Sequence, residues 1–245
     1  MRESPIPMSP MMVRPTLADI KTQTRRILRP QPVGVIDWIC SDMNDVWRAG
    51  VQAGEVPEAG SWTCPYGEIG DRLWVREAWR VPAGLDHLSG KEIDDKRIAA
   101  GYTDPICPIE YVADGWRHEP EWWVLFDDNN EAFKPGRYRH ARFMPRWAAR
   151  TVLEITDTRI ERLQSISTPD AIAEGVTTLP AQWINDHFTD HRERMAAASA
   201  GERSIPNPPS PRRLFEALWE QLNGIGSFKE DPWVWVVSYK RLENA

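Results

Sequence analysis

Alternating hydrophobic and polar positions predict strands in three parts of the chain. The clearest alternation runs over about 150–160, where Leu153 and Ile155 share one face and polar side chains share much of the other. Similar alternation predicts strands at about 72–79 and 233–242. We expect these three strands to lie in one curled sheet or small barrel. Two further short strands are expected in IEYVADGW and EWWVLFDD.

Helical periodicity occurs in shorter stretches. The strongest is PRRLFEALWEQLNG (211–224), which predicts an amphipathic helix that packs Leu214, Leu218 and Leu222 on the sheet. A shorter helix is expected over DAIAEGV (170–176), and another within 11–20. The region 82–143 shows no long periodic element. Helices and strands together predict an α+β fold with about five to seven strands.

Composition narrows the possible classes of protein. The chain has 245 residues, with 15 Gly and 21 Pro, which favours many turns over a helical bundle. No apolar run approaches the ~18 residues of a membrane span, and the N-terminus lacks the apolar core of a signal peptide. Three irregularly spaced Cys predict neither a disulfide framework nor a zinc ribbon, so we expect a reducing cytoplasm. The net charge of −6 means that any nucleic-acid contact needs a local basic patch.

Four segments, in order along the chain, resemble the ASCH family, a branch of the PUA-like β-barrels. More closely, they are similar to the ASCH-like proteins of phages and prophages. The segments are KTQTRRILRP (21–30), CPYGEIGDRLWVREAW (64–79), ARFMPRWAARTVLEITDTRIERLQSIS with DAIAEGV (141–176), and LFEALWEQLNG…PWVWVVSYKRL (214–242). In one departure from the pattern, Asp19 and Ile20 stand where relatives often have Gly.

The resemblance implies a single ASCH-like domain over 1–245, a β-barrel with flanking helices. Long loop insertions are then expected at about 33–63, 80–140 and 178–210. It also implies a pocket at the barrel mouth for RNA or a nucleoside. Some small members are amidohydrolases that remove the acetyl group of N4-acetylcytidine with a Lys, a Thr and a Glu. The matching positions here are Lys21, Thr24 and Glu154.

Amide hydrolysis needs a nucleophile or activated water, a base and a group that stabilises the oxyanion. Thr24 would attack or orient a water. Lys21 would be a base only if burial lowers its pKa by several units. With Glu154 beside it, Lys21 would instead stabilise the oxyanion, and Glu154 would be the base. Apart from the resemblance, Lys21 and Glu154 are both typical of solvated surface positions.

Arginines and aromatic residues supply candidate binding positions. Guanidinium groups suit bidentate phosphate contacts, and Trp147 offers a stacking surface, although barrel packing and ion pairs explain it and Arg146 equally simply. Glu77 is the candidate for a second carboxylate at the pocket. The candidate substrate- or nucleic-acid-binding residues are Arg25, Arg26, Glu77, Arg146 and Trp147.

No metal or cofactor is predicted. His187 and His191 have the i, i+4 spacing of a helical metal pair, but no third ligand stands near them in the sequence, which favours a solvated helix face. Three function classes stay open. They are a hydrolase of a modified nucleoside, a non-catalytic RNA-binding module, and a phage accessory protein that binds a host protein through its insertions. We expect a location in the cytoplasm, that of the host if the protein is phage-encoded.

Overall fold

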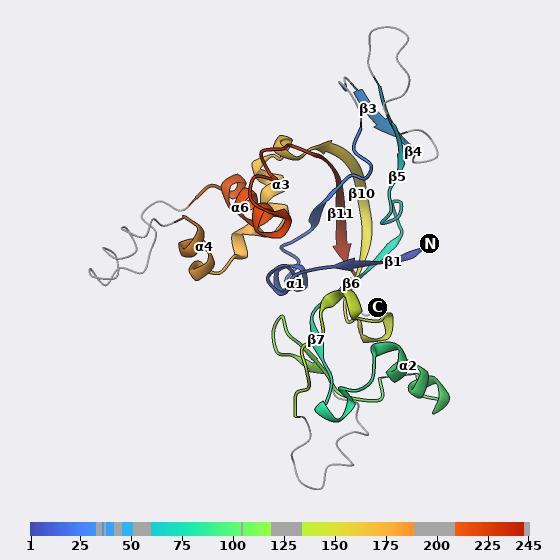
Figure 1. The fold of residues 1–245 in the computed structure, drawn as a ribbon. Coiled ribbons are helices and arrows are strands. Elements are labelled where there is room, and N and C mark those ends of the chain that lie inside the picture. Colours follow the sequence, from blue (N-terminus) through green and yellow to red (C-terminus); the bar gives the residue numbers. More distant parts are fainter. Residues whose placement is uncertain are drawn as a thin grey trace, which may run out of the picture. The chain divides into compact units, whose positions relative to one another are not determined.

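The computed structural model describes residues 1–32, 36, 38–41, 46–50, 60–103, 105–118, 134–188 and 209–242 (Figure 1). The strand expected in EWWVLFDD, His191 and parts of the three expected insertions lie outside these ranges. By its internal contacts the chain divides into two compact units. Unit 1 comprises Met1–Ala18, Gly70–Ile155 and Lys240–Ala245, and unit 2 comprises Asp19–Ile69 and Thr156–Tyr239. Within the described ranges, every helix is too short or too polar to cross a membrane.

The fold is a mixture of helices and several sheets, as the sequence predicted, but the described residues form eleven strands, more than the five to seven expected. The main sheet has the strand order β1-β6-β10-β11-β2, formed by β1 (Glu3–Pro7), β6 (Arg72–Arg76), β10 (Val152–Arg162), β11 (Trp233–Arg241) and β2 (Gln23–Ile27). The prediction that the strands near 72–79, 150–160 and 233–242 share one sheet is therefore confirmed. Among the described strands this sheet stays open, with β1 and β2 as its edges.

In unit 1, β1 is a strand that the sequence did not predict. It pairs in parallel with β6, from Glu3 opposite Arg72 to Pro7 opposite Arg76. Proline cannot donate a ladder hydrogen bond, and an edge strand is where a sheet tolerates it. Helix α1 (Pro10–Leu17) follows, within the range in which a helix was expected.

The remainder of unit 1 is built on a small three-stranded sheet of β7 (Trp79–Arg80), β8 (Ile109–Tyr111) and β9 (Arg117–His118). Helix α2 (Gly90–Ala99) lies in the region where the sequence showed no long periodic element. Its hydrophobic pattern is weak, but Ser89 and Glu92 form a capping box that fixes its start. Three single-turn 3-10 helices complete this part: η1 (Ala83–Leu85), η3 (Ala141–Phe143) and η4 (Arg146–Ala148).

In unit 2, β11 pairs antiparallel with β2, so that Val237 lies opposite Thr24. The other elements of the unit are β3 (Trp38–Ser41), β4 (Val46–Gly50), β5 (Gly60–Thr63), η5 (Leu163–Ser165), α3 (Thr168–Ala173), η6 (Val176–Thr178), α4 (Ala181–Phe188) and α6 (Pro211–Asn223). Helix α3 packs against β2 and α6.

Helix α6 lies where the sequence predicted it, but its buried stripe differs. Leu214 and Leu218 are buried, as expected, together with Phe215 and Trp219. Leu222 is 58% exposed, so its predicted place in the stripe is wrong. The buried positions recur at i, i+1, i+4 and i+5, and the last turn of the helix extends beyond the surface that they cover.

Candidate functional site

Strand β2 sorts the Lys-Thr-x-Thr-Arg-Arg motif onto two faces. Successive side chains of a strand point to opposite sides, which places Gln23 and Arg25 on one face and Thr24 and Arg26 on the other. The Gln23 side chain lies on the same face as that of its cross-strand partner Ser238 in β11, because the Gln23 amide donates to Ser238 Oγ at 3.3 Å. The motif therefore divides its polar groups between the two sides of the sheet.

Lys21, just before β2, is held at the end of α3. Its Nζ donates to Glu174 Oε2 at 2.7 Å, to the Gln23 carbonyl at 2.7 Å and to the Glu174 carbonyl at 3.0 Å. The exposed fraction of the side chain is 3% for Lys21 and 6% for Glu174. Glu174 caps α3, and Gly175 follows it with a left-handed backbone (φ 83°), which ends the helix there. All three N–H groups of the ammonium therefore have acceptors.

The surroundings of Lys21 change its acidity. Burial lowers the pKa of the Lys21 ammonium, and the adjacent Glu174 carboxylate only partly opposes this effect. A lysine that accepts a proton as a base near neutral pH needs such a lowered pKa. The structure supplies both the burial and a carboxylate within proton-transfer distance.

Arg25 lies beside this pair and is completely buried. Its Nη1 donates to Gln23 Oε1 at 2.6 Å and to Glu174 Oε1 at 3.3 Å, and its Nη2 contacts Glu161. The guanidinium also lies 5.7 Å from the centre of the Phe215 ring of α6. Both oxygens of Glu174 are thus paired with a cation, one with Lys21 and the other with Arg25.

An outer layer completes the arrangement. Arg159 Nη2 donates to Asp170 Oδ1 at 3.0 Å, and Ser167 Oγ donates to Asp170 Oδ2 at 2.7 Å. Burial raises the pKa of Asp170, but the hydrogen bonds from Ser167 and Gln23 and the charges of Arg25 and Arg159 outweigh it and hold that pKa below its ordinary value. We call the six charged residues the charge cluster: Lys21, Arg25, Arg159, Glu161, Asp170 and Glu174. Its three cations each contact at least one of its three carboxylates, and Arg159 also pairs with the exposed Asp157 at 3.3 Å.

The structure pairs Glu154, the carboxylate expected at Lys21, with another lysine. Glu154 belongs to unit 1, and Lys240 Nζ of the same unit lies 2.8 Å from its Oε1. The carboxylate in contact with Lys21 is Glu174, which sequence reasoning missed. Its one signal was the i, i+4 spacing of Asp170 and Glu174 in DAIAEGV, which places both on one helix face.

Glu77 also lies in unit 1, buried to 1% exposure. Arg150 forms a fork with its two carboxylate oxygens, at 2.9 and 3.0 Å, and also binds Asp114 at 3.0 Å. Burial raises the pKa of Glu77, against the effect of Arg150. The Arg150 guanidinium also lies 4.1 Å from the centre of the Tyr111 ring. The ion pair joins the segment between β6 and β7 to the segment before β10, and the ring contact adds Tyr111 of β8.

Arg146 and Trp147 serve contacts within unit 1. Arg146 Nε donates to Glu3 Oε2 at 2.9 Å. The Trp147 ring meets Trp79 edge to face at 5.9 Å, and its indole donates to the Gly90 carbonyl at 3.2 Å. These are the packing and ion-pair roles that the sequence left open beside nucleic-acid binding.

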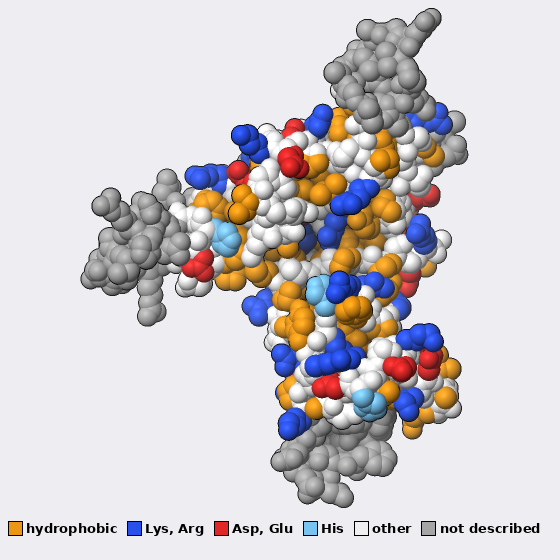
Figure 2. All heavy atoms as spheres, viewed as in Figure 1, with side chains coloured by type: hydrophobic (Ala, Val, Ile, Leu, Met, Phe, Trp, Pro, Cys, Tyr) orange, Lys and Arg blue, Asp and Glu red, His pale blue; other side chains and the backbone are white. Residues whose placement is uncertain are grey.

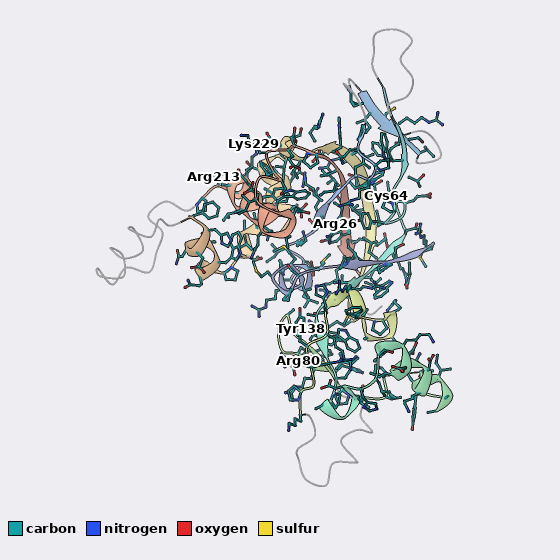
Figure 3. The ribbon with its side chains drawn as sticks, viewed as in Figure 1. Arg26, Cys64, Arg80, Tyr138, Arg213 and Lys229 are labelled. Carbon is teal, nitrogen blue, oxygen red and sulfur yellow. The ribbon has the colours of Figure 1, made fainter. Side chains whose placement is uncertain are left out.

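The remaining candidates are placed as follows. Thr24 is buried in β2, and Arg26 is half-buried on the same face, beside the β2–β11 pair (Figure 3). His187 of α4 has its Nδ1 2.7 Å from the Trp183 carbonyl and stacks on the Trp183 ring. In the described ranges, no three His, Cys, Asp or Glu side chains come together as metal ligands.

The charge cluster can move protons. An ammonium and a carboxylate in direct contact and shielded from water can exchange a proton, and Lys21 and Glu174 meet both conditions. The same hydrogen-bonded arrangement can also hold β2 to α3. No family model, curated protein or solved structure matches this chain.

Proposed function

We propose that this protein is an ASCH-like, PUA-like protein of the cytoplasm that acts on RNA or a nucleoside and hydrolyses the amide of an acylated base such as N4-acetylcytidine. The observation that carries the proposal is the 2.7 Å contact between Lys21 and Glu174, whose side chains are 3% and 6% exposed. It joins the lysine of the Lys-Thr-x-Thr motif to a carboxylate of the kind that amide hydrolysis requires.

Glu174 takes the role that the motif comparison gave to Glu154. In the proposed reaction the Glu174 carboxylate accepts a proton from a water molecule as the water oxygen attacks the amide carbon. Lys21 stabilises the oxyanion by exchanging its longest hydrogen bond, that to the Glu174 carbonyl at 3.0 Å, for one to the substrate. The proton then passes to the leaving amine as the C–N bond breaks. The products are a carboxylic acid and the unmodified base.

Thr24 has a supporting role in this scheme. The alternation of β2 turns it away from Gln23 and Arg25, which contact the carboxylates of the charge cluster. We therefore assign to it a packing role within the sheet rather than attack on the amide. Thr24→Val is then expected to leave kcat and KM nearly unchanged, whereas a nucleophilic Thr24 would lose turnover altogether.

The direct test compares two carboxylates. Purified wild type, Glu174→Gln, Lys21→Ala and the control Glu154→Gln are incubated with N4-acetylcytidine, and release of cytidine is followed by mass spectrometry. Loss of a general base or a charge stabiliser is expected to cost a factor of ~10² or more in kcat. Glu154→Gln should stay within about two-fold, since that side chain pairs with the exposed Lys240. If only Glu154→Gln loses turnover, Glu154 and not Glu174 is the general base.

A second function is favoured because the hydrogen-bonding groups of Lys21 in the charge cluster are already satisfied within the protein. Each N–H of Lys21 already has an acceptor, and each charged side chain of the cluster has an oppositely charged partner. A network satisfied in this way can stabilise unit 2 without any chemistry. The protein would then be a binding module for RNA. Wild type that leaves acylated nucleosides intact, yet binds RNA with an affinity that falls as salt is raised, would establish this function and exclude the hydrolase.

A further inference from the structure

Two segments of unit 1 run antiparallel beside each other. Trp79 and Arg139 exchange both backbone hydrogen bonds, at 3.1 and 3.0 Å, which makes them direct partners. Pro82 and Pro135 form a second bridge, so the second segment carries one more residue than the first between the two bridges. Arg139 is buried and lies over the Trp79 ring, whereas Tyr138 is 51% exposed. Arg80 and Tyr138, labelled in Figure 3, thus stand next to the Trp79–Arg139 bridge on the two segments.

A second arginine lies beside an exposed ring further along the same segment. Arg76 Nη1 donates to the Arg142 carbonyl at 3.3 Å. The Arg142 guanidinium lies 4.7 Å from the centre of the Phe143 ring, and Phe143 is 62% exposed. The backbone turns here through the 3-10 helix η3. One short segment thus presents two exposed aromatic rings next to arginines.

Ion pairing divides the cations of this region into two groups. The segment 134–147 contains no Asp or Glu. Arg146 is paired with Glu3, and the buried Arg139 lies near Asp86. In the described part of the chain neither Arg80 nor Arg142 has a carboxylate within salt-bridge distance, although Glu110 stands opposite Arg80 in the β7–β8 pair. Arg142 therefore adds exposed positive charge to this surface in a protein of net charge −6.

We propose that Arg76, Arg80, Tyr138, Arg142 and Phe143 form a binding surface for single-stranded nucleic acid, which we call the basic–aromatic surface. Its arginines would contact phosphates, and bases would stack on Phe143 and Tyr138. Figure 2 shows Lys and Arg side chains next to hydrophobic ones over the part of unit 1 around β7. The proposal rests on the proposed function and deepens it in one respect: it gives the RNA a contact on unit 1, whereas the charge cluster belongs to unit 2.

A single strand fits this surface better than other anionic partners. A duplex keeps its bases stacked inside, where Phe143 and Tyr138 would not reach their faces. An acidic peptide would satisfy the arginines but leave the two rings without a planar partner. Bases of a single strand offer a flat face at every nucleotide, and its phosphates match the cations beside the rings.

The test is fluorescence anisotropy with labelled twelve-nucleotide single strands of mixed sequence, one of RNA and one of DNA, and with a duplex. The variants are Arg142→Ala, Phe143→Ala, Tyr138→Ala and, as the matched control from the same segment, Arg146→Ala. Phe143→Ala should raise Kd by about 5- to 100-fold through lost stacking. Arg142→Ala should raise Kd about 3- to 10-fold at low salt. It should also reduce the slope of log Kd against log salt concentration by nearly one, the change expected for one lost phosphate contact.

Arg146→Ala should leave Kd within about two-fold, because its side chain is committed to Glu3. Arg142, Phe143 and Tyr138 are exposed, so their replacement is expected to preserve folding, which urea unfolding checks. Equal binding by wild type and the three surface variants would overturn the proposal, as would tighter binding of the duplex. If wild type binds the RNA strand more tightly than the DNA strand, RNA is the ligand, and the reverse result identifies DNA.

The two proposals fail separately. Lys21→Ala and Glu174→Gln are expected to abolish hydrolysis of the free nucleoside and leave strand binding unchanged. Arg142→Ala and Phe143→Ala are expected to weaken strand binding and leave hydrolysis of the free nucleoside unchanged. Loss of both activities in any one folded variant would contradict the assignment of the two functions to different surfaces.

Discussion

The side chains of Lys21 and Glu174 form a salt bridge of 2.7 Å although both are almost completely excluded from solvent. Removing either charge from water is costly, and their attraction offsets that cost only while both are present. Arg25 contacts the other carboxylate oxygen of Glu174, at 3.3 Å. Glu174 is thus the residue on which the two most deeply buried cations of the charge cluster depend.

This dependence predicts an unequal effect of mutations on stability. Glu174→Ala leaves Lys21 and Arg25 without their shared carboxylate, and we expect it to lower the free energy of unfolding by about 3–5 kcal/mol. Lys21→Met removes a single cation, and Glu174 keeps Arg25, so the loss should be smaller. Urea unfolding at neutral pH measures both. A Glu174→Ala protein no less stable than Lys21→Met would contradict the shared role of Glu174.

Lys240 and Glu154 provide the matched exposed pair. They lie 2.8 Å apart, but Lys240 is 60% exposed. Exposed ion pairs contribute about 0–1 kcal/mol, so Lys240→Ala should change the free energy of unfolding by no more than that. Added salt should weaken this small effect further and should leave the effect of Glu174→Ala almost unchanged. Urea unfolding at low and high salt separates the two pairs.

Asp170 predicts how stability falls in acid. The pKa of Asp170 in the folded protein lies below its ordinary value in the unfolded chain. At a pH between these two pKa values, the unfolded chain therefore binds more protons than the folded one. Its contribution to stability is complete above about pH 4 and is lost as the pH falls through the folded pKa. The stability difference between wild type and Asp170→Asn should therefore shrink on acidification below about pH 4. Urea unfolding at pH 3 and pH 6 tests this, and a difference that grows in acid would show the opposite shift.

The sequence predicted the elements whose pattern arises locally. Strand β10, the sheet that it shares with β6 and β11, and helix α6 all follow from side chains that repeat every two or about 3.6 residues. Helix α2 was missed because its pattern is mostly polar, although its Ser89–Glu92 capping box was readable from the sequence. Strand β1 was missed because its prolines fit only an edge, which the sequence does not reveal.

The charge cluster was only half predictable. Lys21 and Thr24 stand in a recognisable motif, but the contact of Lys21 with Glu174 joins residues 153 positions apart. No periodicity encodes such a pairing, because it depends on how α3 packs on β2. Glu154 was the reasonable alternative, as it stands in the strongest strand of the chain. Local patterns locate elements, whereas the partner of a buried charge is set by tertiary packing.

The cysteines predict a simple chemical labelling pattern. Cys40 is exposed, Cys64 and Cys107 are buried, and none forms a disulfide. Burial raises the pKa of Cys107 to about 12, which leaves almost no reactive thiolate at pH 8. One equivalent of thiol per chain should react quickly with Ellman's reagent in the folded protein, and Cys40→Ser should remove it. Rapid reaction of Cys107 before unfolding would contradict its burial.

Gly136 makes the closest backbone approach between the two segments that carry the basic–aromatic surface. Its N–H donates to the Val81 carbonyl at 2.9 Å, and a Cβ at this position would lie 2.6 Å from that same oxygen and against Asp86. Asp86 has little freedom to move, because both of its oxygens accept from the Arg137 N–H, at 2.9 and 3.0 Å. Gly136→Ala must therefore push the segments apart.

We expect Gly136→Ala to lower the free energy of unfolding by about 1–3 kcal/mol, the usual cost of overpacking. It should also weaken single-strand binding, since Tyr138 lies two residues away on the displaced segment. The control is Gly84→Ala, where a Cβ would meet no atom within 4 Å. That variant should match wild type in urea unfolding and in anisotropy. If Gly136→Ala weakens strand binding no more than Gly84→Ala does, the spacing of these two segments does not govern recognition of the strand.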